Sequence, residues 1–207
     1  MEQLNRLRER GRTGLGDLYA LLDEVPYAVL ATVGDGRPWQ VPLLHARDGD
    51  RVLLHGSTGA GALRALDAGA PVSLCVTAFD GLVVAHSTFD SSANYRSAVI
   101  WGHAIRLTGD DQAAALDLLS DRLLPGRTKE VRASRPKEWA ATLVLAVPIV
   151  EGSWLMKARS GGPSAADEEH DVWTGLVPAS LSFGTPEPTP DSVDRPIPAS
   201  VRALTAD

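Results

Sequence analysis

The stretch 52–66 holds the residues whose types and spacing most clearly suggest chemistry. A short apolar run ends at His55 and is followed by a loop of small and hydroxyl-bearing residues, Gly56-Ser57-Thr58-Gly59. Apolar residues at helical spacing resume at Leu63. A strand that enters a helix through such a loop gathers free backbone N–H groups and two hydroxyls, which suits a phosphate or carboxylate. The alternative is an ordinary strand–helix turn capped by one of the two hydroxyls.

Other reactive residue types lack the spacing of a known catalytic or metal site. The five histidines form neither an H-x-x-x-H nor an H-E-x-x-H pattern, and a single cysteine cannot build a structural zinc site. Ser57 is not part of a G-x-S-x-G nucleophile elbow. The sequence therefore assigns no catalytic residue and no metal ligand.

Composition narrows the function classes. The 207 residues carry a formal net charge of -6 and contain no long basic run, which argues against nucleic acid and anionic membrane surfaces as partners. Cys75 is the only cysteine and lies in an apolar run, as expected in a reducing compartment. No apolar stretch is long enough to span a bilayer, and the charged N-terminus is unlike a signal peptide. We expect a soluble cytoplasmic protein.

Hydrophobic periodicity gives the elements that must position these residues. Helical spacing predicts helices over 15–25, about 59–68 and 110–124. Alternating or continuous apolar runs bounded by turn residues predict strands over 27–33, 38–46, 51–55, 71–77, 82–87, 94–107, 142–150, 153–158 and 172–183. Gly102 in the long strand 94–107 suggests a bulge or bend.

Hairpins with few helices and no regular β-α-β alternation favour an α+β fold, an antiparallel β-barrel with peripheral helices. Residues 1–14 are rich in Arg and Glu and predict an N-terminal arm, which is either solvated or docked on a partner subunit. Residues 15–183 form the predicted domain. Residues 184–207 are a Pro-rich C-terminal tail, expected to be extended or disordered.

Four stretches in this order resemble the FMN-binding split barrels related to pyridoxamine 5′-phosphate oxidase. They are Asp35-Gly36-Arg37-Pro38 with Val41-Pro42-Leu43-Leu44, Leu54-His55-Gly56-Ser57-Thr58-Gly59, Asn94-Tyr95-Arg96-Ser97 through Trp101-Gly102-His103-Ala104, and Lys157-Ala158-Arg159 with Val172-Trp173-Thr174-Gly175-Leu176-Val177-Pro178. The chain is most similar to the branch of that family that includes nitroimidazole reductases and actinobacterial flavin-binding proteins.

The resemblance implies an antiparallel split β-barrel that forms a homodimer with an FMN site at each end of the interface. It assigns the isoalloxazine to the backbone of Val41, Pro42, Leu43 and Leu44. It assigns the phosphate to the turn His55, Gly56, Ser57 and Thr58. Side chains of Tyr95, Arg96 and Ser97 would border the flavin, and Lys157 and Trp173 would approach from the partner subunit.

Departures from the family pattern limit what the resemblance implies. Close relatives of the oxidase carry an Arg on the hairpin strand and an Arg-Lys pair after the phosphate turn, where this chain has Val41 and the small residues 59–62. The phosphate would then depend on backbone N–H groups, the two hydroxyls, and Arg64 or Arg96. Contacts from charged Arg or Lys side chains bind a phosphate more strongly than neutral donors do, so we expect weaker flavin binding. The scarcity of basic residues also argues against oxidation of a phosphorylated substrate.

These expectations combine into an FMN-dependent oxidoreductase that takes electrons from a transiently bound NAD(P)H and passes them to a small electron-poor acceptor. The alternative is a non-catalytic flavin- or haem-binding protein, or a haem enzyme on the same barrel, with His55, His86 and His103 as candidate axial ligands. Deazaflavin F420 is less favoured because its acidic tail calls for a basic channel. Trp39 and Trp173 are candidate aromatic walls of the site.

Overall fold

The computed structural model describes residues 8–34, 36–165 and 171–205. The first seven residues of the predicted arm, Asp35 of the hairpin turn and His170 lie outside this range.

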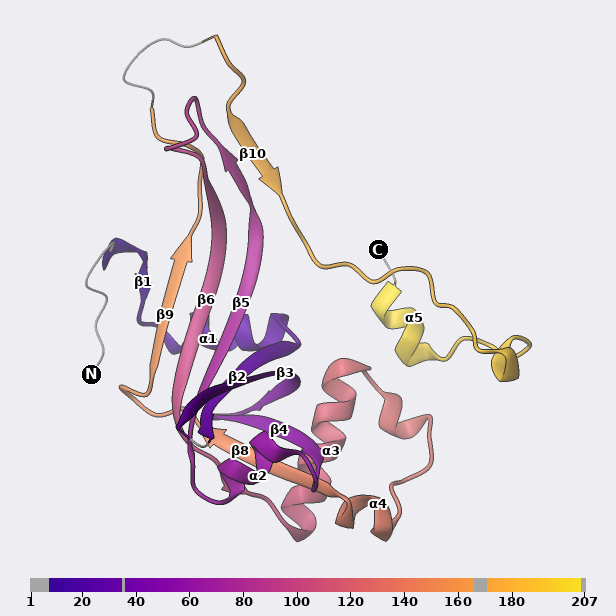
Figure 1. Ribbon diagram of the computed structural model, residues 1–207. Coiled ribbons are helices and arrows are strands. Elements are labelled where there is room, and N and C mark those ends of the chain that lie inside the picture. The colour runs from indigo at the N-terminus through magenta and orange to yellow at the C-terminus, as the bar shows by residue number, and fades with distance from the viewer. Residues whose placement is uncertain (1–7, 35, 166–170, 206–207) are drawn as a thin grey trace.

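An antiparallel sheet dominates the described part of the chain, where its ten strands follow the order β1-β9-β6-β5-β2-β3-β4-β8-β7, with β10 paired to β5 (Figure 1). The strands are β1 (Gly11–Arg12), β2 (Tyr27–Gly34), β3 (Arg37–Asp48), β4 (Arg51–Ser57), β5 (Pro71–Val84), β6 (Ser92–His103), β7 (Ile105–Arg106), β8 (Thr142–Pro148), β9 (Trp154–Arg159) and β10 (Gly175–Pro178). The helices are α1 (Leu15–Glu24), α2 (Gly61–Asp67), α3 (Gly109–Leu123), α4 (Pro136–Ala140) and α5 (Ala199–Thr205), with 3-10 turns η1 (Arg8–Arg10), η2 (Arg127–Lys129) and η3 (Pro190–Ser192). The α+β class with an antiparallel sheet is confirmed.

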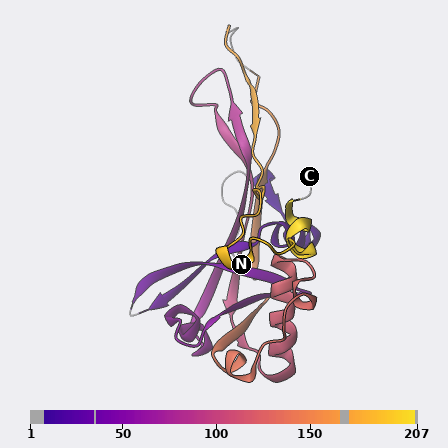
Figure 2. The same cartoon turned by 90° about the vertical axis from the view of Figure 1, so that its right-hand side faces the viewer.

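The main core lies on one side of the strands. Every second residue of β2, β5 and β6 points inward, so that Leu30, Leu74 and Ile100 are paired side by side and fully buried. The apolar stripe of α1 and one face of α2 pack into this cluster. A second cluster forms where α3 covers β3, β4 and β8, on the side seen clearly in Figure 2.

Two strand boundaries differ from the sequence prediction. The predicted strands 71–77 and 82–87 are one long strand, β5, whose pairing with β6 shifts register between Phe79 and Gly81. Gly81 has φ +141°, which only glycine adopts readily, so the chain continues through a bulge where a turn was expected. The predicted strand 94–107 ends at His103, and β7 pairs instead with β8.

The β5–β6 hairpin beyond Gly81 rises away from the rest of the sheet and carries β10 on its edge (Figure 1). We call residues 81–94 and 175–178 the upper arm. The strand predicted over 172–183 is shortened to β10. At the other end of the chain, β1 within the predicted N-terminal arm pairs with β9.

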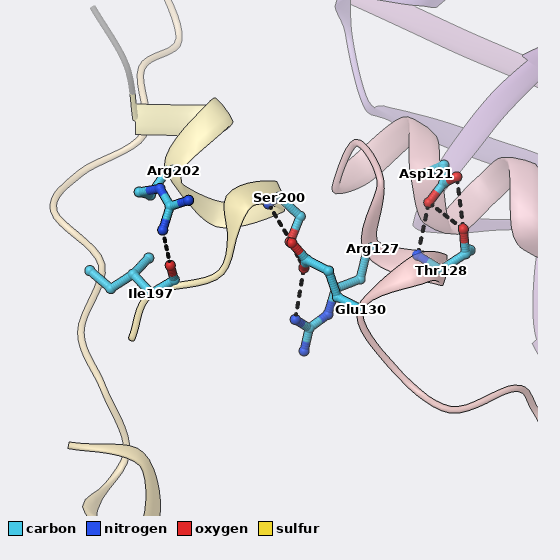
Figure 3. Close-up of polar contacts among 7 residues, drawn as sticks. All are labelled: Asp121, Arg127, Thr128, Glu130, Ile197, Ser200 and Arg202. Atoms are coloured by element: carbon cyan, nitrogen blue, oxygen red, sulfur yellow. Dashed lines mark hydrogen bonds and ion pairs between the residues drawn. The ribbon is translucent and has the colours of Figure 1, made fainter. Parts of the chain in front are cut away.

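The C-terminal tail crosses from the upper arm to α3 and ends in α5 (Figure 1). Residues 184–189 have no regular structure, as expected for the tail, and the same holds for residues 179–183, which were predicted to be in a strand. However, Ser200 at the start of α5 is 1% exposed, and both its backbone N–H and its hydroxyl donate to the Glu130 carboxylate, at 3.0 and 2.5 Å (Figure 3). The tail is therefore fastened to the body of the molecule at its end.

No described helix is both long enough and apolar enough to cross a membrane.

Candidate functional site

The side of the sheet opposite the main core is an uncovered apolar face. Residues that alternate with the buried ones on β2, β3, β5, β6 and β9 point to this side, which we call the outer face. Its large apolar members are half-exposed, including Tyr27 at 49%, Leu44 at 46% and Phe79 at 52%. Large exposed apolar patches are typical of ligand or protein interaction sites.

Several of the predicted site residues share this outer face. Leu44 is paired with Tyr27 across β3 and β2, and Ser97 is paired with Thr77 on one side and Lys157 on the other. Paired residues of antiparallel strands point to the same side of a sheet, so the three central strands present Thr77, Ser97 and Lys157 in one transverse row. Tyr95 lies on the same face, next to Phe79 and Arg159 in the adjacent row.

Lys157 is a cation on this largely apolar face. Among the described residues it has no ion pair, and its half-buried stem lies beside β6 and β1. An ammonium group beside a flat apolar surface can meet negative charge on the edge of a planar heteroaromatic ring. The resemblance expects Lys157 to approach the flavin from the partner subunit, and within this chain its side chain lies on the outer face of its own sheet.

Arg96 lies on the other side of the sheet from its two neighbours. Its guanidinium forms ion pairs with Glu24 of α1 and with Asp80 of β5, the latter through two hydrogen bonds of 3.0 and 2.6 Å. Hydrogen bonds that Arg96 donates to the Glu24 and Asp80 carboxylates hold its pKa far above the ordinary value, and the contact with Arg96 lowers the pKa of Glu24. Sequence reasoning missed that period-2 alternation separates Arg96 from Tyr95 and Ser97.

The predicted hairpin residues divide between the two faces. Val41 and Leu43 pack against the main core, whereas Pro42 and Leu44 are exposed on the outer side. In the described chain, β4 pairs with β3 only from His45 onward, so the edge of β3 between Arg37 and Leu44 that faces away from β2 has no strand partner. This open edge presents backbone donors and acceptors beside the outer face, which fits the role that the resemblance gives to residues 41–44.

In the loop predicted to hold a phosphate, the backbone N–H groups of residues 58–60 already have acceptors within the protein. The N–H of Thr58 donates to the Ala141 carbonyl, that of Gly59 to the Ser57 hydroxyl, and that of Ala60 to the Ser57 carbonyl, at 3.0, 3.1 and 2.8 Å. Helix α2 begins only at Gly61, with Ala60 as its N-cap and no side-chain cap, so capping by Ser57 or Thr58 is wrong. Gly56 faces inward, where a Cβ would lie 2.6 Å from Leu63. The loop therefore offers fewer free N–H groups than the sequence suggested.

The two candidate aromatic walls lie in different places. Trp39 of β3 packs over Gly61 at the end of the phosphate loop, where a glycine Cβ would lie 2.4 Å from its ring. Trp173 precedes β10 on the upper arm, is 67% exposed and rests against Gly175. Within one chain, the structure brings Trp39 to the loop and leaves Trp173 beside the arm.

The histidines occupy separate environments. His55 is half-buried on β4, where burial lowers its pKa, and His86 lies at the end of the upper arm, 3.3 Å from an Asp90 oxygen. His103 is exposed at the end of β6. No group of three or more His, Cys, Asp or Glu side chains that could hold a metal ion occurs in the described ranges.

His45 is a buried polar residue that no sequence pattern distinguishes from the other histidines. It is 1% exposed on β3, and neither of its ring nitrogens has a hydrogen-bond partner among the described residues. Burial lowers its pKa to about 4 and outweighs the opposing effect of the nearby Leu22 backbone, whose contact with the ring lacks the geometry of a full hydrogen bond; Arg122 lowers the pKa further and Asp23 opposes it. The imidazole is therefore neutral at pH 7.

The family model of pyridoxamine 5′-phosphate oxidase matches residues 16–155 of the chain. The chain belongs to the pyridoxamine 5′-phosphate oxidase family. This confirms the resemblance drawn from the four sequence stretches and agrees with the split-barrel fold expected from them. A comparison with curated proteins found no match.

Two solved structures resemble nearly the whole chain. The FAD and haem binding protein from Mycobacterium smegmatis is 45% identical, with 95% of this chain and 97% of that chain covered and a TM-score of 0.91. The flavocytochrome Anf3 from Azotobacter vinelandii is 29% identical, with 99% and 96% covered and a TM-score of 0.88. A 5-nitroimidazole antibiotic resistance protein from Bacteroides thetaiotaomicron, at 16% identity and a TM-score of 0.59 over 71% of this chain and 85% of that one, shares the fold.

Proposed function

We propose that this protein is a flavin-dependent oxidoreductase. The observation that carries the proposal is the outer face with its half-exposed apolar side chains, bounded by the open edge of β3 and by Lys157, which has no ion pair with any described residue. A planar, mostly apolar ring with polar groups along one edge needs this combination of a flat surface, backbone hydrogen-bonding groups and a positive charge. Membership of the family and the flavin-binding relatives support the same cofactor class.

The flavin that fits best is FAD, in place of the FMN expected from the sequence. FMN ends in a phosphate dianion, which binds well where several free N–H groups or Arg side chains converge. Here three loop N–H groups already have acceptors, and Arg96 is bound to two carboxylates. A diphosphate inside a longer cofactor demands less concentrated charge, and the relative at 45% identity is an FAD and haem binding protein.

When bound, a flavin accepts and releases a hydride or single electrons. The chain's own residues would bind and orient it: the open edge of β3 between Arg37 and Leu44 would hydrogen-bond its polar edge. Lys157 would stabilise negative charge on the ring. We propose that electrons come from a transiently bound NAD(P)H, since the sequence carries no fingerprint of a tightly held nicotinamide nucleotide, and leave to a small electron-poor acceptor.

We also propose a homodimer in which the outer faces of two copies cover the flavins. The exposed Tyr27, Leu44 and Phe79 would be buried in that arrangement, and Trp173 on the upper arm could then reach the partner's flavin. Burial of such a face excludes water from the cofactor, which strengthens the effect of Lys157. The cytoplasmic location expected from the sequence stays a prediction.

A flavocytochrome is the second candidate function. Two structures that resemble nearly the whole chain are an FAD and haem binding protein and a flavocytochrome. In this chain, the lowered pKa of the half-buried His55 favours the neutral imidazole that binds iron, and the Asp90 carboxylate near His86 is the kind of partner that orients a histidine ligand. A Soret band from protein supplied with haem, lost in either the His55→Ala or the His86→Ala variant, would support it.

The proposed function is tested by supplying purified protein with FAD, desalting it and recording its absorption spectrum, followed by anaerobic addition of NADH or NADPH. Retained flavin that is bleached by a nicotinamide and restored by an electron-poor nitro compound or quinone is the expected result. Flavin that binds and is not reduced would support the non-catalytic alternative. Failure to retain FAD or FMN would overturn the proposal.

The contribution of Lys157 is tested in the same preparation. Lys157→Met is expected to weaken FAD binding about tenfold, because one charge-assisted contact is lost, whereas Lys157→Arg keeps most of the affinity. Arg195→Met, at an exposed position of the C-terminal tail, serves as the matched loss of one positive charge. Equal affinities in Lys157→Met and Arg195→Met would contradict the placement of the flavin beside Lys157.

A further inference from the structure

We infer that Arg159 and Tyr95 form an anion-binding subsite on the outer face, which takes a phosphate or carboxylate group of the molecule that exchanges electrons with the flavin. The inference rests on the proposed flavin-dependent function and adds to it the part of the site that selects the visiting substrate. It is carried by strand register, by hydrogen bonding and by the distribution of charge on three neighbouring strands.

Strand register groups two cations with two hydroxyls. Strands β9, β6 and β5 lie side by side in the sheet (Figure 1). Lys157 is paired with Ser97, and Arg159, two residues further along β9, is paired with Tyr95. Paired residues, and residues two apart on one strand, share one side of a sheet, so all four side chains belong to the outer face, where each residue is partly buried.

No acidic side chain on these strands balances the two cations. Strands β6 and β9 contain no Asp or Glu, and the single acid of β5, Asp80, is bonded to Arg96 on the other side of the sheet. Among the described residues, neither Lys157 nor Arg159 has an ion pair. Two positive charges on one face of a strand repel each other, and a bound anion offsets that repulsion.

The guanidinium of Arg159 is held in place without being neutralised. In the described chain its one hydrogen bond runs from Nη1 to the Asn94 amide oxygen, at 2.6 Å, and the Asn94 amide nitrogen donates to the Gly161 carbonyl at 3.1 Å. This neutral partner leaves Nε and Nη2 able to donate to a ligand. Two adjacent guanidinium N–H groups bind a carboxylate or phosphate in a bidentate manner, and the Tyr95 hydroxyl can donate a third hydrogen bond.

The subsite lies next to the position proposed for the flavin ring. The ring is proposed beside Lys157, and the row that holds Arg159 and Tyr95 is the next one along the sheet, roughly 7 Å away. Phe79, paired with Tyr95 and 52% exposed, adds an apolar surface to this row. A flat molecule on the flavin ring with an anionic group at its edge can therefore reach Arg159. The diphosphate of NAD(P)H and the carboxylate of an aromatic acceptor share this chemistry.

The experiment compares two pairs of reactants that differ chiefly in their anionic groups. NADH is set against 1-benzyl-1,4-dihydronicotinamide, which has the same reducing ring without phosphates, and 4-nitrobenzoate is set against 4-nitrobenzyl alcohol. In flavin-loaded protein, Arg159→Met should raise the half-saturating concentration of the anionic member of one pair about tenfold, the effect of one charge-assisted contact. The neutral member should be unaffected, and Arg159→Lys should keep part of the affinity.

Binding without turnover is measured by calorimetric titration of inorganic diphosphate into the same protein. The wild type should bind diphosphate more tightly than Arg159→Met does, and Tyr95→Phe should weaken this binding by a smaller factor. Arg195→Met, at an exposed position of the C-terminal tail, is the matched control for the lost charge and should behave as the wild type in every measurement.

The outcomes separate this inference from the proposed function. An effect confined to the NADH pair assigns the subsite to the donor, and one confined to the nitro pair assigns it to the acceptor. Equal values in Arg159→Met and Arg195→Met, either for every reactant or for diphosphate, would overturn the inference and leave the flavin chemistry intact. A loss of FAD affinity in Arg159→Met as large as that in Lys157→Met would also overturn it, because the guanidinium would then contact the cofactor itself. Protein that retains no flavin would overturn the proposed function, whereas the diphosphate titration would still show whether Arg159 binds an anion.

Discussion

At the scale of single residues, adjacent residues of one strand have different roles, because their side chains alternate between the two faces of the sheet. Ser97 points to the outer face beside Lys157, whereas Arg96 points to the other side and joins α1 to β5 through Glu24 and Asp80. Arg96, the charged residue of the predicted flavin motif, therefore stabilises the packing of α1 against the sheet. Removing it would leave two carboxylates close together without a counter-ion.

Because Arg96 and Lys157 lie on different faces of the sheet, substituting Arg96 should affect stability and substituting Lys157 should affect flavin binding. Arg96→Met should lower the free energy of unfolding by about 1–2 kcal/mol, because its ion pairs are partly exposed and hence partly screened, with little change in FAD affinity. Lys157→Met should weaken FAD binding and leave the unfolding free energy nearly unchanged. Urea unfolding and FAD titration of both variants test this. Loss of FAD affinity in Arg96→Met without loss of stability would show that Arg96 contacts the cofactor.

His45 predicts a pH dependence of stability. Its pKa is about 4 in the folded protein, through burial, against about 6.5 when unfolded, so the unfolded chain takes up the proton first as the pH falls. The contribution is complete above pH 6.5 and is lost as the pH falls from 6.5 toward 4, at a cost of about 2 kcal/mol by pH 5. Urea unfolding between pH 7.5 and 5 should show this slope.

The control for that slope is a variant that cannot be protonated. His45→Leu should flatten the pH dependence over the same range, whereas His103→Gln, at an exposed position, should leave it unchanged. A wild-type slope that persists in His45→Leu would assign the effect to another group.

At the scale of elements, β10 depends on the absence of a side chain in β5. Gly81 has φ +141°, and a Cβ there would lie 2.4 Å from the Val177 carbonyl oxygen, so only glycine allows β10 to pair with the bulged strand. The pairing of β10, the third strand of the upper arm, therefore depends on Gly81.

Gly81→Ala should separate β10 from β5 and destabilise the fold by about 1–3 kcal/mol through combined strain and collision. Hydrogen exchange of residues 175–178 should rise. Gly69→Ala is the matched control, because it has φ +92° with no atom within 4 Å of the added Cβ and so pays for strain alone. Unchanged exchange of β10 in Gly81→Ala would contradict the close approach.

At the scale of the whole molecule, the C-terminal tail runs from the upper arm back to the α3–η2 region, where α5 is bound. Ser200 donates both its N–H and its hydroxyl to Glu130, which also pairs with Arg127 (Figure 3). Hydrogen bonds from Ser200 lower the pKa of Glu130. The carboxylate therefore supports docking above its unfolded pKa, and this support is lost as the pH falls through the lowered folded value.

Glu130→Ala should release α5 without unfolding the sheet. Hydrogen exchange of residues 199–205 is expected to increase and the chain to become sensitive to proteases in the tail, while the thermal unfolding of the barrel changes little. Glu187→Ala, which removes an exposed carboxylate from the same tail, should leave exchange at α5 unaltered. Continued protection of α5 in Glu130→Ala would mean that apolar contacts alone hold it.

The sequence by itself determined the family, the α+β class and most elements. Those conclusions depend on local information: periodicity, turn residues and motifs such as Asn94-Tyr95-Arg96-Ser97. Tertiary structure decided what no local pattern carries. It decided that β5 is one strand, because the bulge at Gly81 depends on how β6 and β10 pair with it. Tertiary structure also determines that the backbone N–H groups of residues 58–60 already have acceptors. One of these acceptors, the Ala141 carbonyl, is 83 residues away in sequence from Thr58, so no local pattern could reveal it. Contacts between residues distant in sequence settle which groups remain available to a cofactor, and these contacts exist only after the chain has folded.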